Sequence, residues 1–236
     1  MTPVHLSRGR ARLLAAVLAL ALAAGALVGA APPAAGQTTP GPCPVLEGWS
    51  FQGTLSEGSM RMGSRITATG LTGRMCGLFE PTTQGVTYVA TVHPSHIGLD
   101  PATSRVGLVR ITTALTAPGS VRLETLAPDF GSPRPFAMSG DLDVTFGLFG
   151  YRCTARLSAL QLRTAPSGSM TGEHLTNDTT GALVGRVVAN EFSVPAVVAS
   201  TGCPARIANL VNSIVGLPAA AGVSSFDYRI RLAPNV

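Results

Sequence analysis

The densest group of side chains that could perform chemistry is His93-Pro94-Ser95-His96, with Asp100 shortly after it. Two imidazoles and a carboxylate can hold a zinc ion and leave one coordination position open for catalysis. Metal-binding helices space such histidines at i and i+4, a geometry that Pro94 excludes here. The pattern therefore favours ordinary surface histidines, and we expect neither a metal nor another cofactor. If a metal were bound, its candidate ligands would be His93, His96 and Asp100.

A serine hydrolase is the main catalytic alternative. Ser95 lies between the two histidines, and Glu173-His174 could supply a base with a carboxylate that orients it. However, the chain has no Gly-x-Ser-x-Gly segment, and Ser-x-x-Lys is excluded because lysine is absent. No glycine-rich loop of the phosphate-binding type occurs either. The residues favour a protein that is not an enzyme, with a secreted hydrolase using His93 and His96 as an alternative.

Asp141 and Asp143 alternate on a predicted strand, so both carboxylates should face the same side of a sheet. Paired carboxylates can bind calcium or act in acid–base catalysis, and glycosidases hold theirs at a defined separation across the scissile bond. Sugar-binding clefts are usually lined with aromatic side chains, and the chain has a single tryptophan, Trp49. We therefore interpret the two aspartates as exposed charges on a strand.

The N-terminus has the layout of a secretory signal peptide. Three arginines in the first 12 residues precede an apolar run from Leu13 to Ala31, and Pro32 ends any helix there. We assign residues 1–36 to this signal and a short linker, and residues 37–236 to a secreted domain. An uncleaved N-terminal anchor is the alternative, because about 20 apolar residues can span a bilayer.

Losing the leader would change the charge balance. The full chain has 17 arginines, no lysine and 12 acidic residues, which give a formal net charge of +5. Without the three leader arginines, 14 arginines and 12 acidic residues remain, and the net charge falls to +2. No basic stripe or tail remains, so we expect no nucleic-acid partner. Any membrane contact should come from an uncleaved leader. The expected location is the cell envelope or the medium, with an unidentified partner there.

Cysteine usage also indicates export. The chain has four cysteines, Cys43, Cys76, Cys153 and Cys203, which all follow the leader and form no Cys-x-x-Cys pair. An even number in an exported chain predicts disulfides that use all of them. The spacing allows three pairings and does not choose among them.

Past the leader, short stretches with strand periodicity alternate with clusters of Gly, Pro, Ser and Thr. The clearest alternation places Phe226, Tyr228, Ile230 and Leu232 on one face of a strand. So many short strands predict a mainly β protein, an antiparallel sandwich or barrel. Similar patterns occur at Met60–Ala68, Val86–Val92, Val106–Leu115, Val121–Leu126, Leu142–Phe149, Tyr151–Leu157 and Leu183–Phe192.

One short amphipathic helix is predicted over residues 204–215. Pro204 suits its first turn and Gly216 its left-handed end. We expect the helix to pack against the sheet, tethered through Cys203, because Arg206 is its only charged residue. Its apolar stripe would consist of Ile207, Leu210, Val211, Ile214 and Val215.

A weak internal repeat relates residues 43–116 to residues 153–232. Its clearest match sets Gly58-Ser59-Met60 beside Gly168-Ser169-Met170, at an offset of 110 (168 − 58). The offset grows along the chain, as loop insertions would cause, but glycine, threonine and leucine are common enough here for chance matches. Two pseudo-repeated halves and one undivided domain both stay open. If the repeat is real, pairing within each half joins Cys43 to Cys76 and Cys153 to Cys203, although Cys76 and Cys203 do not align.

The segment Asn190–Ala196, followed by Cys203, Leu210–Asn212 and Gly216–Pro218, resembles the C-terminal region of secreted proteins of unassigned function from GC-rich Gram-positive bacteria. This resemblance transfers no catalytic residue. Together with the leader and the cysteines, it favours a non-catalytic exported module with a structural or binding role. A carrier of an apolar ligand such as a lipid is an alternative, prompted by few charges and scattered methionines.

Overall fold

The computed structural model describes residues 50–81, 87–126, 136–163, 170–172 and 175–234. All of them belong to the unit Thr38–Val236. The predicted leader, Cys43 and His174 lie outside the described ranges. The internal repeat also stays a prediction.

The described chain is mainly antiparallel β-structure with a single short helix, which confirms the predicted fold class. Every pairing between its strands is antiparallel. The elements are β1 (Ser50–Met62), β2 (Ile66–Pro81), β3 (Thr87–Leu99), β4 (Ala102–Val106), β5 (Val109–Thr116), β6 (Val121–Leu126), β7 (Phe136–Leu148), β8 (Tyr151–Arg163), β9 (Met170–Gly172), β10 (Thr176–Asn177), β11 (Leu183–Ala189), α2 (Ala205–Val215) and β12 (Ser225–Pro234).

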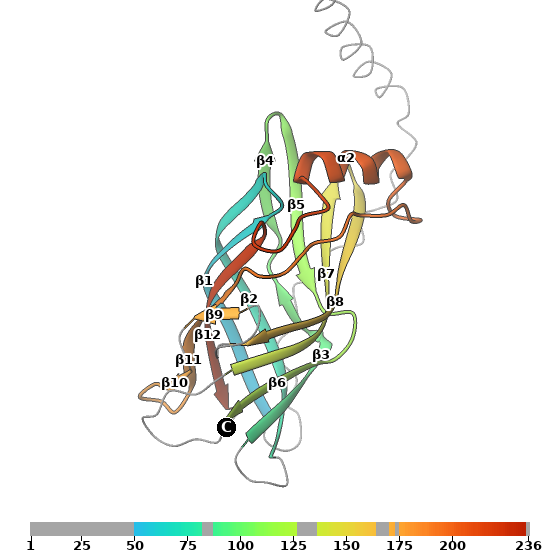
Figure 1. Ribbon diagram of the computed structural model, residues 1–236. Coiled ribbons are helices and arrows are strands. Elements are labelled where there is room, and N and C mark those ends of the chain that lie inside the picture. Colours follow the sequence, from blue (N-terminus) through green and yellow to red (C-terminus); the bar gives the residue numbers. More distant parts are fainter. Residues whose placement is uncertain (1–49, 82–86, 127–135, 164–169, 173–174, 235–236) are drawn as a thin grey trace, which may run out of the picture. The chain divides into compact units, whose positions relative to one another are not determined.

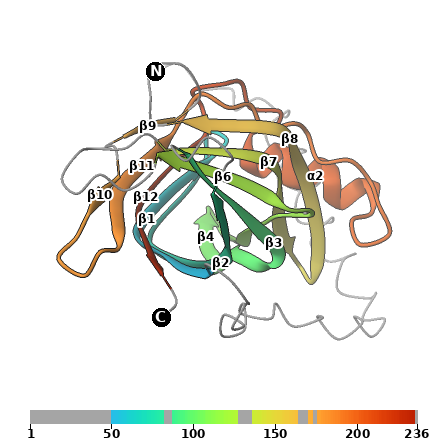
Figure 2. The same ribbon diagram turned by 90° about the horizontal axis from the view of Figure 1, so that it is seen from below.

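All the strands belong to one sheet (Figure 1). Neighbouring strands follow the order β10-β11-β12-β1-β2-β3-β6-β7-β5-β4, with β8 beside β7 and β9 beside β11. Both β3 and β7 are long enough to pair with β6 along one part and with β5 along another. The sheet curls, so that its strands surround a common interior in the view of Figure 2.

The inner face of this curl carries the core. Along β12, Phe226, Tyr228, Ile230 and Leu232 are buried while Arg229 is exposed, as the alternation predicts. Strand β7 follows the same alternation from residue 142 to 148. One face of the sheet is therefore apolar and the other carries polar and charged side chains, as expected of an antiparallel sheet.

Two predictions for the strands were wrong at hairpin turns. The stretches Met60–Ala68 and Val106–Leu115 are not single strands, because β1 ends and β2 begins within the first, and β4 and β5 meet within the second. Gly63 and Gly107 reverse the chain with φ values of +57° and +60°, a region that glycine enters readily. The predicted strand Tyr151–Leu157 falls within β8, and its first residue, Tyr151, is 41% exposed because it lies at the tip between β7 and β8.

Helix α2 begins and ends where the sequence predicts. It follows Pro204, and Gly216 ends it in the left-handed conformation with its N–H donated to the Asn212 carbonyl. Leu210 is exposed, at the margin of the predicted stripe. Within the described ranges, no helix is long and apolar enough to cross a membrane. The helix packs against β7 and β8 and buries Ala208, Val211, Ile214 and Val215.

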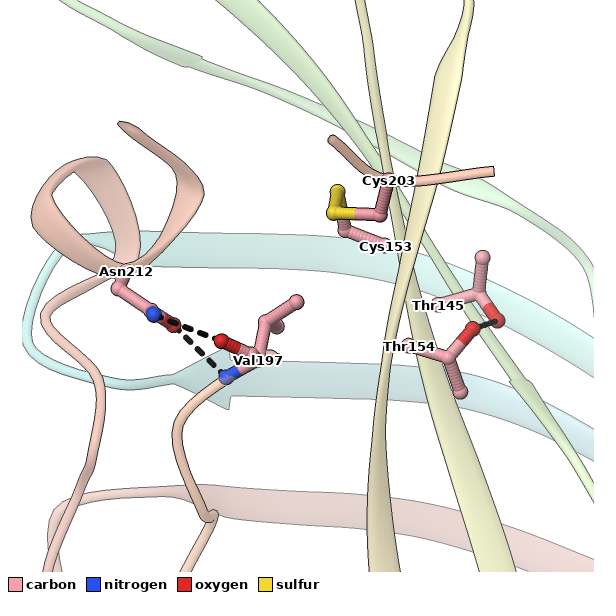
Figure 3. Close-up of a disulfide and its surroundings, with 6 residues drawn as sticks. All are labelled: Thr145, Cys153, Thr154, Val197, Cys203 and Asn212. Carbon is pink, nitrogen blue, oxygen red and sulfur yellow. Dashed lines mark hydrogen bonds between the residues drawn. A yellow bond between two sulfur atoms is a disulfide. The ribbon is translucent and has the colours of Figure 1, made fainter. Parts of the chain in front are cut away.

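A disulfide ties the start of α2 to the sheet. Cys153 of β8 is bonded to Cys203, which precedes the helix (Figure 3). Beside this bond, the Arg152 N–H donates to the Gly202 carbonyl at 3.0 Å. The predicted tether through Cys203 is therefore confirmed. Cys76 is buried and disulfide-bonded as well.

Asn212, in the last turn of α2, makes a second link. Its Oδ1 accepts a hydrogen bond from the Val197 N–H at 2.8 Å, and its Nδ2 donates to the Val197 carbonyl at 2.9 Å (Figure 3). One side-chain amide thus satisfies both backbone groups of Val197. The segment that crosses from β11 to α2 is held to the helix by this clamp.

We expect the double variant Cys153→Ala/Cys203→Ala to lose about 4 kcal/mol of unfolding free energy, because the bond closes a loop with a sequence separation of 50. Urea denaturation measures this change. Substitution is preferable to a reducing agent because it leaves the disulfide of Cys76 intact. A loss below about 1 kcal/mol would mean that the unfolded chain is already constrained in this region.

Asn212→Ala should lower the free energy of unfolding by about 1–3 kcal/mol, because both backbone groups of Val197 lose their partner. Asn209→Ala is the matched control, since Asn209 lies on the same helix and is exposed. The control should change stability by less than about 0.5 kcal/mol. Equal changes in the two variants would assign the effect to helix propensity instead of the clamp.

Candidate functional site

An apolar pocket lies inside the curled sheet. Its walls come from strands that are far apart in the sequence, and its volume is about 80 Å³. Among the described residues, the walls present no polar surface. Representative wall residues are Leu55 of β1, Met75 of β2, Leu99 of β3, Leu115 of β5, Met138 of β7 and Tyr228 of β12.

Two glycines on β1 make room for large side chains of the wall. A Cβ on Gly53 would overlap Met75, and a Cβ on Gly58 would overlap the ring of Tyr228. The lack of a side chain at these two positions leaves room for Met75 of β2 and Tyr228 of β12, the two strands that pair with β1. The local sequence of β1 therefore helps to shape the pocket.

The size of the pocket limits what it can hold. A volume of about 80 Å³ is roughly half of the ~150 Å³ of an engineered apolar cavity in another protein that stays dry and binds benzene. Met75 and Met138 border the space, and unbranched thioether side chains adapt easily to a ligand. The pocket suits a single small ring or a short hydrocarbon segment, and a whole lipid does not fit inside it.

Tyr228 brings a phenol to the wall of this pocket. Its side chain is 3% exposed, and its hydroxyl has no hydrogen-bond partner among the described residues. Burial raises the pKa of Tyr228 above its ordinary value, because the charged phenolate is disfavoured among apolar side chains. Phe226 lies beside its ring, at 6.5 Å between centroids, and Phe192 packs against Phe226 at 4.7 Å.

The predicted metal candidates lie around the point where β3 changes its partner from β6 to β5. The side chains of His93 and His96 are outside the described residues. The Asp100 carboxylate accepts a hydrogen bond from the Thr72 hydroxyl, and the Asp100 N–H donates to the Thr72 carbonyl at 2.8 Å. Asp100 thus holds the end of β3 against β2. Within the part of the chain that the structure describes, no three His, Cys, Asp or Glu side chains gather as a metal site.

The hydrolase candidates are not brought together by any described contact. The Ser95 side chain and Glu173-His174 lie outside the described residues. The use of His93 and His96 in catalysis therefore stays a prediction.

Asp141 and Asp143 form part of the charged outer face. Asp143 accepts two hydrogen bonds from the Arg156 guanidinium, at 2.8 and 3.1 Å across β7 and β8. Hydrogen bonding and charge attraction from Asp143 raise the pKa of Arg156, and the charge of Asp141 adds to this. The β7–β8 register shifts between Gly140 and Leu142, so Asp141 lies at an irregularity. These contacts agree with the interpretation of both aspartates as strand charges.

Sequence reasoning did not identify the pocket. Its wall residues range from Leu55 to Ile230, and only the curl of the sheet brings them together. The scattered methionines were the available signal. Met75 and Met138 line the pocket, whereas Met60 and Met62 fill the core without lining it.

No family model, curated protein or solved structure matches this chain. The fold and the pocket define the class of protein: a curled antiparallel β module with an apolar interior pocket. Any function has to be inferred from these residues and their contacts.

Tyr228→Phe should raise the free energy of unfolding, because an unpaired buried hydroxyl costs about 1–3 kcal/mol. Tyr151→Phe removes the same hydroxyl from an exposed tyrosine and should leave stability unchanged. Chemical denaturation of both variants measures the difference. If Tyr228→Phe were destabilising, the hydroxyl would have a hydrogen-bond partner in solution.

Proposed function

We propose that this chain is an exported, disulfide-stapled β module with a non-catalytic binding role, and that its interior pocket holds a small apolar group. The observation that carries the proposal is the pocket itself, whose walls are apolar throughout the described residues. An apolar cavity has nothing to offer a water molecule but offers dispersion contacts to a hydrocarbon. Binding in it would be selective for size and shape.

Export is supported by two independent features. The first 36 residues have the charge and hydropathy layout of a signal peptide. The disulfide between Cys153 and Cys203 is a bond that persists in oxidising compartments and is rare in the cytosol. A place in the cell envelope or the surrounding medium would accommodate both.

The proposed ligand is smaller than the sequence suggested. A lipid carrier usually encloses several hundred Å³ of ligand, whereas this pocket has about 80 Å³. The proposal is therefore restricted to a small ring, or to the end of a hydrocarbon chain whose remainder lies outside. No described contact favours the hydrolase alternative over this one.

We expect benzene and hexane to shift the methyl NMR signals of Met75 and Met138 in a saturable way. These two methyl groups border the pocket, whereas Met60 and Met62 are buried elsewhere in the core and serve as internal controls. Titration of the protein labelled with ¹³C at its methionine methyl groups measures the four signals at once.

Ala117→Leu supplies the matched variant, because Ala117 lines the pocket and the larger side chain fills it. The variant should keep the resonances of the folded protein and lose the saturable shifts. Equal shifts of all four methyl groups, or none in the parent protein, would refute binding in the pocket.

A further inference from the structure

The exposed large apolar side chains of the described chain gather at one end of the molecule. They lie on the tips of the β4–β5 and β7–β8 hairpins, on α2 and on the segment clamped to α2. Figure 1 shows these two tips and α2 together at the top of the sheet. The side chains are Leu108, Phe149, Tyr151, Val198 and Leu210.

The β4–β5 tip ends in an apolar side chain with no cover at all. Leu108 follows Gly107 in the turn, and its side chain is fully exposed, at 105%. Turns of this kind usually carry polar residues. Immediately behind the tip, Arg105 and Arg110 lie directly opposite each other in the register of the two strands. Like charges in this position weaken a hairpin unless an anion lies between or beside them.

The β7–β8 tip repeats this combination. Phe149 is 67% exposed and has a φ of +52°, a conformation that costs a bulky residue about 1–2 kcal/mol. Tyr151 and Arg152 follow it and are also exposed. A strained, exposed phenylalanine in a tight turn contributes nothing to the core, and such strain is typical of functional positions.

The two tips emerge next to each other from the sheet. Strand β5 pairs with β7 up to Thr112 and Gly147, and continuing this register places Arg110 beside Phe149. The disulfide of Cys153 lies just behind the second tip and anchors it to the segment before α2. The apolar tips therefore project side by side from a cross-linked base.

Several arginines at this end have no acidic partner in the part of the chain that the structure describes. On the outer face of the sheet, Arg156 and Arg186 form ion pairs with Asp143 and Asp227, whereas Arg74 forms none within the described residues. Arg105, Arg110, Arg152 and Arg206 have no ion pair within the described residues. This end thus combines protruding apolar side chains with uncompensated positive charge.

We propose that this end docks on the surface of an anionic lipid membrane. Leu108 and Phe149 would enter the acyl region, and Arg105 and Arg110 would meet the lipid phosphates behind them. Arginine suits bidentate binding of phosphate, and tyrosine such as Tyr151 is favoured at the membrane–water interface. A fluid lipid surface can accommodate two narrow protruding tips without having a preformed shape. A folded protein partner would instead need a matching cleft for each tip.

This surface is separate from the leader, to which the sequence assigned any membrane contact. It is also independent of the interior pocket, since none of the residues named at the two tips lines it. Docking and ligand binding can therefore fail or succeed separately in experiment.

The test is sedimentation of the protein with vesicles made of equal parts of phosphatidylglycerol and phosphatidylcholine. The full-length gene is expressed, and all variants share whichever N-terminus maturation leaves. Leu108→Ser/Phe149→Ser should weaken partitioning at least about tenfold, because two side chains lose their burial in hydrocarbon. Arg105→Gln/Arg110→Gln should weaken it roughly 30-fold, since each arginine contributes about fivefold at an anionic surface.

The matched charge control is Arg122→Gln/Arg229→Gln, which also removes two positive charges, but from exposed positions outside the two tips. It should retain nearly all binding, and pure phosphatidylcholine vesicles or high salt should remove the contribution of the arginines. Equal losses in the control and the tip variants would overturn the proposal. So would absence of binding by the parent protein. Self-association that depends on Leu108 and Phe149 would assign the tips to a second copy of the chain instead.

Discussion

A large sheet with one apolar face has to cover that face, and little else in the described chain is available to do so. Helix α2 has 11 residues and covers only part of that face, chiefly over β7 and β8. The sheet therefore covers itself: it curls until β1 and β2 share a core with β7 and β12. The natural twist of strands favours this curvature, and the register shifts in β1 and β7 bend the sheet further.

Self-covering explains both the pocket and its modest size. The pairing of the strands sets the shape of the interior space. The side chains that point into this space from opposite parts of the sheet do not fill it completely. Glycines at 53 and 58 admit Met75 and Tyr228, yet the packing leaves about 80 Å³ unfilled. A void among apolar side chains costs stability unless something occupies it. An apolar ligand of the proposed kind would offset this cost, so its binding would also stabilise the fold.

The end of the curled sheet that carries α2 is held together by several links. At the end with α2, the bond between Cys153 and Cys203 and the amide clamp of Asn212 hold the crossing segment in place. The hairpin tips there can then expose Leu108 and Phe149 without loosening the base beneath them. A rigid base with apolar tips is useful for attachment, because the tips lose little entropy on binding. The proposed ligand site would thus come from the curl, and the proposed membrane-docking site from the hairpin tips.

Local sequence was sufficient wherever near neighbours decide the structure. The bounds of α2 follow from Pro204, Gly216 and helical spacing, and the faces of β12 follow from alternation, because each depends on residues within a few positions. The turn at Gly63 was missed because Met60, Met62, Ile66 and Ala68 keep an even spacing across it, and the turn at Gly107 was missed because apolar residues flank it on both sides. The choice of Cys203 as partner of Cys153, the contact of Asp100 with Thr72 and the pocket depend on strand register and curvature, which bring residues dozens of positions apart together. Those were decided only by the tertiary structure, because no local pattern encodes how far a sheet curls.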